Sequence, residues 1–173
     1  SMTGALAWIA RWIASKPLSA GLEGACAAIR GGPRLPKLKA GMDLVLIGDL
    51  EREWIARETA LKLQETSYLP ARAYGLEEFL HGPRVSTGPN TLVVAFSEDS
   101  EPRWKDLRDY LHIVQARLLE ADCAGVAPEG RWLAQLFWGQ RLALEACRAL
   151  GTDADSLRTD DPRYKKARTE LDL

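Results

Sequence analysis

The chain has 173 residues, 46% of them apolar, and a net charge of −1 from 23 basic and 24 acidic residues. This length fits one domain with a hydrophobic core. Because charges of both signs are interspersed, the sequence shows no positively charged surface of the kind that binds nucleic acid. No apolar run reaches the ~18 residues that a membrane span needs. Three cysteines without metal-ligand spacing are typical of reduced thiols. We therefore expect a cytoplasmic protein without nucleic-acid, membrane or metal partners.

The N-terminal region, residues 1–41, is predicted to form linker helices and a loop. Pro17 separates two helical stretches because proline cannot continue a helix. The first stretch carries a wide apolar arc of side chains that lie four residues apart: Trp8, Ile9, Trp12 and Ile13. We expect this arc to be buried against another surface.

Two continuously apolar segments, residues 43–48 and 91–96, predict strands covered on both faces. A further strand is expected at 71–74, and residues 118–128 carry a weaker strand pattern. Helices are predicted at 51–67, at 76–80, from about Pro102, and at 131–150, where Gly151 ends the last one. Alternating strands and helices predict a three-layer α/β/α sandwich with a parallel sheet. This domain should span residues 42–151, and residues 152–173 should form a polar tail.

Three charged residues, Glu58, Lys62 and Glu65, follow the first strand on the predicted helix. At the helical period they lie within an arc of roughly 60°, at the margin of the buried face. Partial burial would raise the pKa of a carboxylate there toward the range of a general base, and the lysine would lower it. The alternative is a surface ion pair worth ~0.3–0.5 kcal/mol.

Two other segments are candidates for chemistry. His81 precedes Gly82 and Pro83 at a sharp turn, where a histidine is either a functional loop residue or merely half-exposed. The basic run at residues 163–168 is either solvated or provides a lysine that forms a Schiff base with a carbonyl compound. We interpret His112, inside a predicted helix, as structural.

These segments occur together in a familiar order. Residues 55–68 (IARETALKLQETSY), 77–83 (EEFLHGP) and 151–158 (GTDADSLR) resemble motifs of the second sugar-isomerase (SIS) domain of glucosamine-6-phosphate synthases. The motifs of that family are A-x-E-G-A-L-K-L-K-E-x-S-Y, G-E-L-K-H-G-P and G-T-D-x-D-x-P-R. The resemblance is dense over residues 44–83, recurs at 139–158 and is loose between them.

The resemblance implies a role for each matching residue. Glu65 would move a proton between C1 and C2 of an open-chain sugar phosphate, and His81 would assist ring opening from the neighbouring subunit of a homodimer. Glu58 and Lys62 would line the substrate site. The imine-forming lysine of the family corresponds to Lys166, or to Lys165 after a one-residue slip. No cofactor is implied.

The sequence also departs from the family pattern. Thr59 replaces a glycine, Gln64 replaces a lysine, and Asp49 and Glu51 stand where a glycine-rich turn is expected. The S-x-S-G-x-T phosphate loop of a first SIS domain is absent, as is an N-terminal cysteine for glutamine hydrolysis, since Cys26 lies in a predicted helix.

These features predict the C-terminal half of a sugar-phosphate or aminosugar-phosphate isomerase, inactive by itself, which works with a first SIS domain in cis or in trans. The substrate would be a hexose or aminohexose phosphate. The alternative is a non-catalytic module that senses sugar phosphates in a regulator, or that only dimerises. Retention of both Glu65 and His81 favours the enzyme, because a sensor needs neither a base nor a ring-opening acid.

Overall fold

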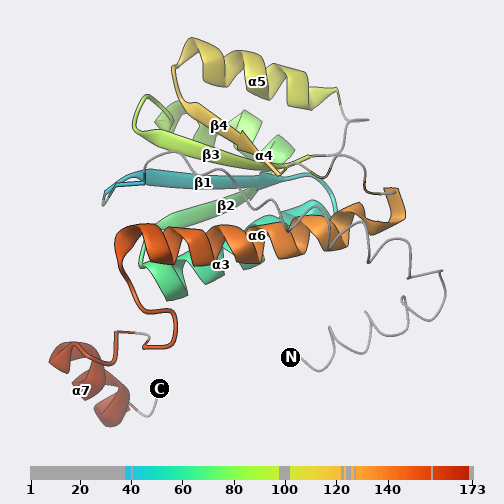
Figure 1. Ribbon diagram of the computed structural model, residues 1–173. Coiled ribbons are helices and arrows are strands. Elements are labelled where there is room, and N and C mark those ends of the chain that lie inside the picture. The colour runs from blue at the N-terminus through green and yellow to red at the C-terminus, as the bar shows by residue number, and fades with distance from the viewer. Residues whose placement is uncertain are drawn as a thin grey trace.

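The sheet consists of four parallel strands in the order β2-β1-β3-β4 (Figure 1). The computed structural model describes residues 38–39, 41–97, 102–121, 123, 126, 128–156 and 158–171, so the predicted N-terminal helices with their apolar arc, and Cys26, lie outside the described residues. The strands are β1 (Asp43–Gly48), β2 (Ala71–Gly75), β3 (Thr91–Phe96) and β4 (Arg117–Glu120). The predicted parallel sheet is confirmed, and β4 overlaps only the first three residues of the weak strand pattern at 118–128.

Helices cover both faces of the sheet (Figure 1). Helices α3 (Arg52–Ser67) and α6 (Pro128–Leu150) lie side by side on one face, and α4 (Leu76–His81) and α5 (Arg103–Ile113) lie on the other. Within β1, Leu44 and Leu46 pack toward α3 and α6, whereas Val45 and Ile47 pack toward α4 and α5. This alternation explains why the strand is apolar throughout, because both of its faces are buried.

The connections change face between two neighbouring strands. The β1-α3-β2 unit uses one face of the sheet and the β3-α5-β4 unit uses the other (Figure 1). Strands β1 and β3 are paired in register from Asp43 opposite Thr91 to Gly48 opposite Phe96. Their carboxyl ends therefore meet at a topological switch point, where open α/β sheets commonly bind ligands.

The polar tail contains a helix that the sequence analysis did not predict. Helix α7 spans Pro162–Leu171 and has no buried residue, so its sequence lacks the apolar periodicity that reveals helices. Its start has recognisable chemistry: Pro162 lies in the first turn, and the Asp161 carboxylate accepts a hydrogen bond from the Arg163 backbone N–H at 2.9 Å.

One helix start differs from its prediction. Helix α6 begins at Pro128, three residues before the predicted start, because proline is favourable in a first helical turn. His112 lies inside α5 as expected; its side chain is exposed in the last turn, where a basic group suits the helix dipole. Gly151 follows α6 at φ +67°, as expected of a residue that ends a helix.

Candidate functional site

The predicted charged residues of α3 contact one another through Lys62. Its Nζ lies 2.8 Å from Glu65 Oε2 and 3.9 Å from Glu58 Oε1. The hydrogen bond to Glu65 raises the pKa of Lys62 above its usual value. All three side chains are only partly buried, as expected for the margin of the packed face. Lys62 therefore fixes the Glu65 carboxylate without removing it from solvent.

Glu65 also lines a cavity of about 590 Å³ at the amino ends of the strands, which we call the amino edge of the sheet. Because α3 runs back along the sheet after β1, its C-terminal end reaches the start of β2. The polar side chains around the cavity come from α3, from β2 and from the C-terminal segment: Gln64, Glu65, Tyr68, Arg72, Arg158 and Tyr164. Sequence positions 64–72 thus meet positions 158–164 in one place.

Tyr68 joins the end of α3 to the C-terminal segment. Its hydroxyl accepts a hydrogen bond from the Arg158 backbone N–H at 2.9 Å and lies 3.1 Å from Ser156 Oγ. Nearby, Thr152 Oγ1 donates to the Thr66 carbonyl at 2.7 Å. These bonds hold the GTDADSLR stretch against α3, which gives that stretch a structural role.

The Arg158 guanidinium lies against two aromatic rings in the cavity wall. Its central carbon is 4.3 Å from the centroid of the Tyr68 ring and 5.0 Å from that of Tyr164. Arg158 also donates a hydrogen bond to the Tyr164 hydroxyl. Cation–π contacts of this kind restrict an arginine that would otherwise sample many rotamers.

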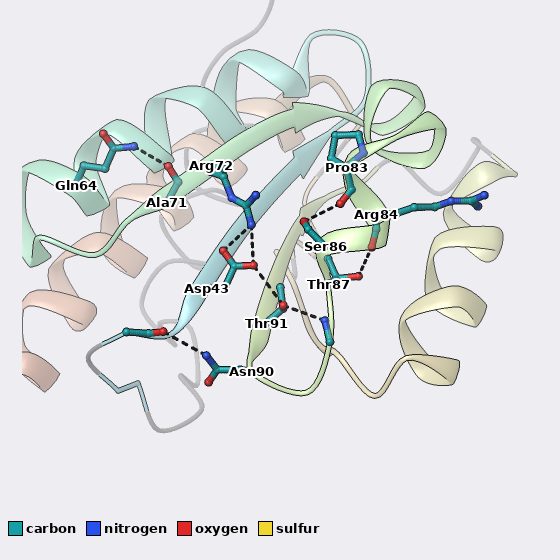
Figure 2. Close-up of polar contacts among 12 residues, drawn as sticks. Asp43, Gln64, Ala71, Arg72, Pro83, Arg84, Ser86, Thr87, Asn90 and Thr91 are labelled. Carbon is teal, nitrogen blue, oxygen red and sulfur yellow. Dashed lines mark hydrogen bonds and ion pairs between the residues drawn. The ribbon is translucent and has the colours of Figure 1, made fainter.

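The other arginine of the cavity is paired within the protein. Figure 2 shows Arg72 directed at Asp43, with Nη2 2.6 and 2.7 Å from the two carboxylate oxygens. This hydrogen bond raises the pKa of Arg72. Thr91 Oγ1 donates to the same carboxylate at 3.3 Å, and Gln64 Nε2 donates to the Ala71 carbonyl at 2.6 Å (Figure 2). The amino ends of β1, β2 and β3 are therefore tied together beside the cavity.

At the opposite edge, the switch point is filled by side chains of the chain itself. Trp104 Nε1 donates to Asp49 Oδ2 at 2.6 Å, and Arg52 Nη1 is 3.6 Å from Asp49 Oδ1. Arg52 Nε donates to Gln135 Oε1 at 3.0 Å, and Gln135 Nε2 donates to the Ser97 carbonyl at 2.9 Å. The exposed fractions of Asp49 and Arg52 are 7% and 6%. We call Asp49, Arg52, Trp104 and Gln135 the carboxyl-edge network.

This network changes the interpretation of Asp49. From the sequence, Asp49 was expected to place a negative charge at the entrance of the helix, but its carboxylate is buried and contacts Trp104 and Arg52. The substitution at Thr59 also has a structural partner. A Cβ built on Gly139 of α6 would lie 2.1 Å from Thr59 Oγ1, so the threonine of α3 occupies space that a glycine of α6 leaves open.

Of the predicted site residues, Glu65 lines the cavity, whereas Glu58, Lys62, His81, Lys165 and Lys166 do not. The His81 side chain is 78% exposed at the end of α4, with Nε2 3.4 Å from Glu77 Oε2. The Lys166 side chain is 72% exposed on α7, with Nζ 3.7 Å from Glu170 Oε1. Lys165 is exposed as well. The chain therefore brings together Glu58, Lys62 and Glu65, and it leaves the histidine and both lysines on other surfaces.

Four cavity residues, Tyr68, Arg72, Arg158 and Tyr164, were not singled out from the sequence. Tyr68 and Arg158 end two of the matching motifs, which was the available indication, but 90 positions separate them. Their contact could not be inferred from spacing. Among the described residues no group of three or more His, Cys, Asp or Glu side chains could hold a metal ion. No described helix has the length and apolar character needed to cross a membrane.

No protein-family model matches the chain. Its sequence is 34% identical over 122 residues to a glutamine–fructose-6-phosphate aminotransferase (isomerizing) of Legionella pneumophila strain Lens, covering 60% of this chain and 20% of that protein. The chain thus spans about a fifth of the length of the curated relatives it matches.

Solved structures share the fold. A glucosamine-6-phosphate deaminase of Thermotoga maritima superposes with a TM-score of 0.61 at 23% identity, covering 79% of this chain and 43% of that one. An Escherichia coli CFT073 protein in complex with A5P gives a TM-score of 0.61 at 15% identity, covering 84% and 95%. The chain therefore has the SIS fold, and its sequence resembles the glutamine–fructose-6-phosphate aminotransferases.

Proposed function

We propose that the chain is the C-terminal SIS domain of a sugar-phosphate isomerase, or of a related aminosugar-phosphate isomerase or deaminase. The observation that carries this proposal is the position of Glu65, which lines the cavity while Lys62 holds its carboxylate at 2.8 Å. The likeness to an isomerizing aminotransferase supports the same chemistry. A volume of about 590 Å³ is within the range of small-molecule sites.

Aldose–ketose isomerisation needs one group that removes a proton from one carbon and returns it to the next. In our proposal Glu65 takes the proton from C2 or C1 of the open-chain sugar and delivers it to the other carbon through an enediol or enolamine. Lys62 positions the carboxylate, and its positive charge offsets the negative charge that develops on the sugar oxygen. Glu58 contacts the same lysine and acts through it.

The rest of the site would come from other chains or domains. The exposed His81 is available to assist ring opening in the active site of a second copy, and Lys166 is available to form an imine with the ketose. A first SIS domain, in cis or in trans, would provide the serine- and threonine-rich phosphate loop that this sequence lacks. The chain alone should then be inactive as an isomerase.

A second candidate is a non-catalytic module that binds sugar phosphates or dimerises. The observation that favours it is the ordinary chemistry of the α3 ion pairs, because partly exposed i,i+3 and i,i+4 pairs such as Glu65–Lys62 also occur on helix surfaces that have no function. Under this alternative, Glu65 would have no part in proton transfer.

Substitution of Glu65 by Gln, in the chain assembled with its first SIS domain, separates the two candidates. Glu65→Gln keeps the shape and removes the base, so isomerisation should fall about 10²- to 10⁴-fold with unchanged stability. The matched control is Glu58→Gln, which removes the other partner of Lys62 and should have a smaller effect. Full activity of Glu65→Gln would exclude the proposed role.

A further inference from the structure

The two arginines that line the cavity differ in their charge partners. Arg72 is neutralised by both oxygens of Asp43. The Arg158 guanidinium contacts two tyrosine rings and a tyrosine hydroxyl, and among the described residues it donates no hydrogen bond to a carboxylate, although its charge also acts on the nearby Asp161 carboxylate. The neighbouring Asp161 carboxylate is bonded to Arg163 at 2.6 and 3.0 Å. Arg158 is therefore the cation that the cavity can offer to a ligand.

The contacts that fix Arg158 leave N–H groups of its guanidinium available to a ligand. Tyr68 and Tyr164 contact the guanidinium with their rings, and a guanidinium that stacks on rings keeps its N–H donors at its edge. One of these edge groups donates to the Tyr164 hydroxyl. The remaining donors form a planar fork that matches the oxygens of a phosphate or a carboxylate.

The backbone around this cation is in a disfavoured conformation. Arg158 has φ +57° and Tyr68 has φ +58°, although both residues carry a Cβ. Their contact is thus made by two residues in the left-handed region, where glycine or asparagine would be easier to accommodate. Such conformations persist where surrounding contacts enforce them, and they cluster at ligand sites.

We propose that Arg158 binds the phosphate group of the sugar phosphate in the Glu65 cavity. This inference rests on the proposed function and adds the anion contact that this domain contributes. A phosphate monoester is the anion chosen because Glu65, in the same cavity, faces the sugar carbons in the proposed reaction. A single arginine makes this a weak site, so the chain alone should bind sugar phosphates weakly.

Titration of the full chain with fructose-6-phosphate, followed by NMR, tests the proposal. Arg158→Gln should weaken binding about ten- to a hundredfold, the loss expected from one charge-assisted contact. The matched control is Arg168→Gln, which removes the same charge from an exposed position of α7 and should bind as the unaltered chain does. Arg158→Lys keeps the charge but loses the fork, so its affinity should be intermediate.

A measurement on the unaltered chain avoids the possibility that a variant loses its tail structure. On addition of inorganic phosphate, the side-chain Nε–H signal of Arg158 should shift while that of Arg72 stays in place. Absence of that shift, or equal weakening by Arg158→Gln and Arg168→Gln, would overturn the proposal. Glu65→Gln should keep its phosphate affinity, so loss of isomerisation there with retained Arg158-dependent binding distinguishes the two hypotheses.

Discussion

At the carboxyl edge of β1 and β3, polar side chains are buried and paired with one another, whereas at the amino edge they surround an open cavity. Asp49 and Arg52 of the first region have exposed fractions of 7% and 6%, and their hydrogen bonds close the switch point. Glu65 and Arg158 of the second region line the cavity and are only partly buried. Buried polar groups that hydrogen-bond to one another stabilise the fold, whereas polar groups that line a cavity can bind a ligand.

The same helices build both regions. Helix α3 begins with Arg52 in the carboxyl-edge network and ends beside Tyr68 at the cavity, and α6 leads from Gln135 to the segment that carries Arg158. Because the two helices pack along their length, their separation fixes both edges at once. Substitutions in the carboxyl-edge network should therefore change the stability of the protein, and substitutions at the cavity should change its chemistry or its ligand binding.

Substitution of Arg52 by Ala should give the largest loss of stability. It removes the Arg52 cation from beside the buried Asp49 carboxylate and removes the donor to Gln135, which should lower the free energy of unfolding by about 3–5 kcal/mol. Urea denaturation measures this difference. The control is Arg148→Ala, at an exposed pair with Glu145, where a change of about 0–1 kcal/mol is expected.

If Arg52→Ala were no more destabilising than Arg148→Ala, the carboxyl-edge network would not be a structural element. The comparison also predicts the reverse pattern for Glu65→Gln, which should alter chemistry without altering the urea midpoint. Arg52 would then contribute to stability alone, and Glu65 to chemistry alone.

Substitution of Gly139 by Ala should give a smaller loss, because it tests the spacing between α3 and α6. The added Cβ would lie 2.1 Å from Thr59 Oγ1, so the helices must separate or Thr59 must move, at about 1–3 kcal/mol. The second substitution Thr59→Gly in the same chain removes the clash. Thermal unfolding of the single and double variants measures the coupling.

A double variant as unstable as Gly139→Ala would contradict direct contact as the cause. If the helix spacing controls both edges, Gly139→Ala should also weaken the phosphate binding of Arg158. The double variant should then regain phosphate binding together with stability.

The fold was predictable where sequence pattern and burial coincide. The strands at 43–48 and 91–96 are buried on both faces, so their composition is sufficient to identify them. Strand β4 was weakly predicted, because none of its residues is fully buried and two of its four residues are charged. Helix α7 was missed for a related reason, since no buried face imposes a period on its sequence.

The site was predictable only as far as local spacing reaches. Glu58, Lys62 and Glu65 meet because one helix carries them at positions three and four apart. Arg158 and Tyr164 reach the same cavity through tertiary contacts with Tyr68, which no periodicity encodes. The roles of His81 and Lys166 remain predictions that rest on the resemblance.

The smallest expected effect concerns acid and the tail that carries Tyr164. The hydrogen bonds from the Arg163 side chain and backbone lower the pKa of Asp161 from 3.8 to about 2. Since the folded state favours the charged carboxylate, this contact contributes fully above the unfolded pKa and is lost as the pH falls from about 4 to about 2. The first turn of α7 should therefore loosen in acid before the sheet does.

The amide signals of Arg163 and Tyr164, followed by NMR between pH 7 and pH 2, measure this loosening. Asp161→Asn should show the loosened first turn already at pH 7, and its signals should no longer change between pH 4 and 2. Glu170→Gln, at the other end of α7, is the control and should titrate as the unaltered chain does. Identical pH responses of Asp161→Asn and the unaltered chain would mean that another carboxylate holds the tail. Because Tyr164 contacts Arg158, a loosened α7 should also weaken the proposed phosphate binding.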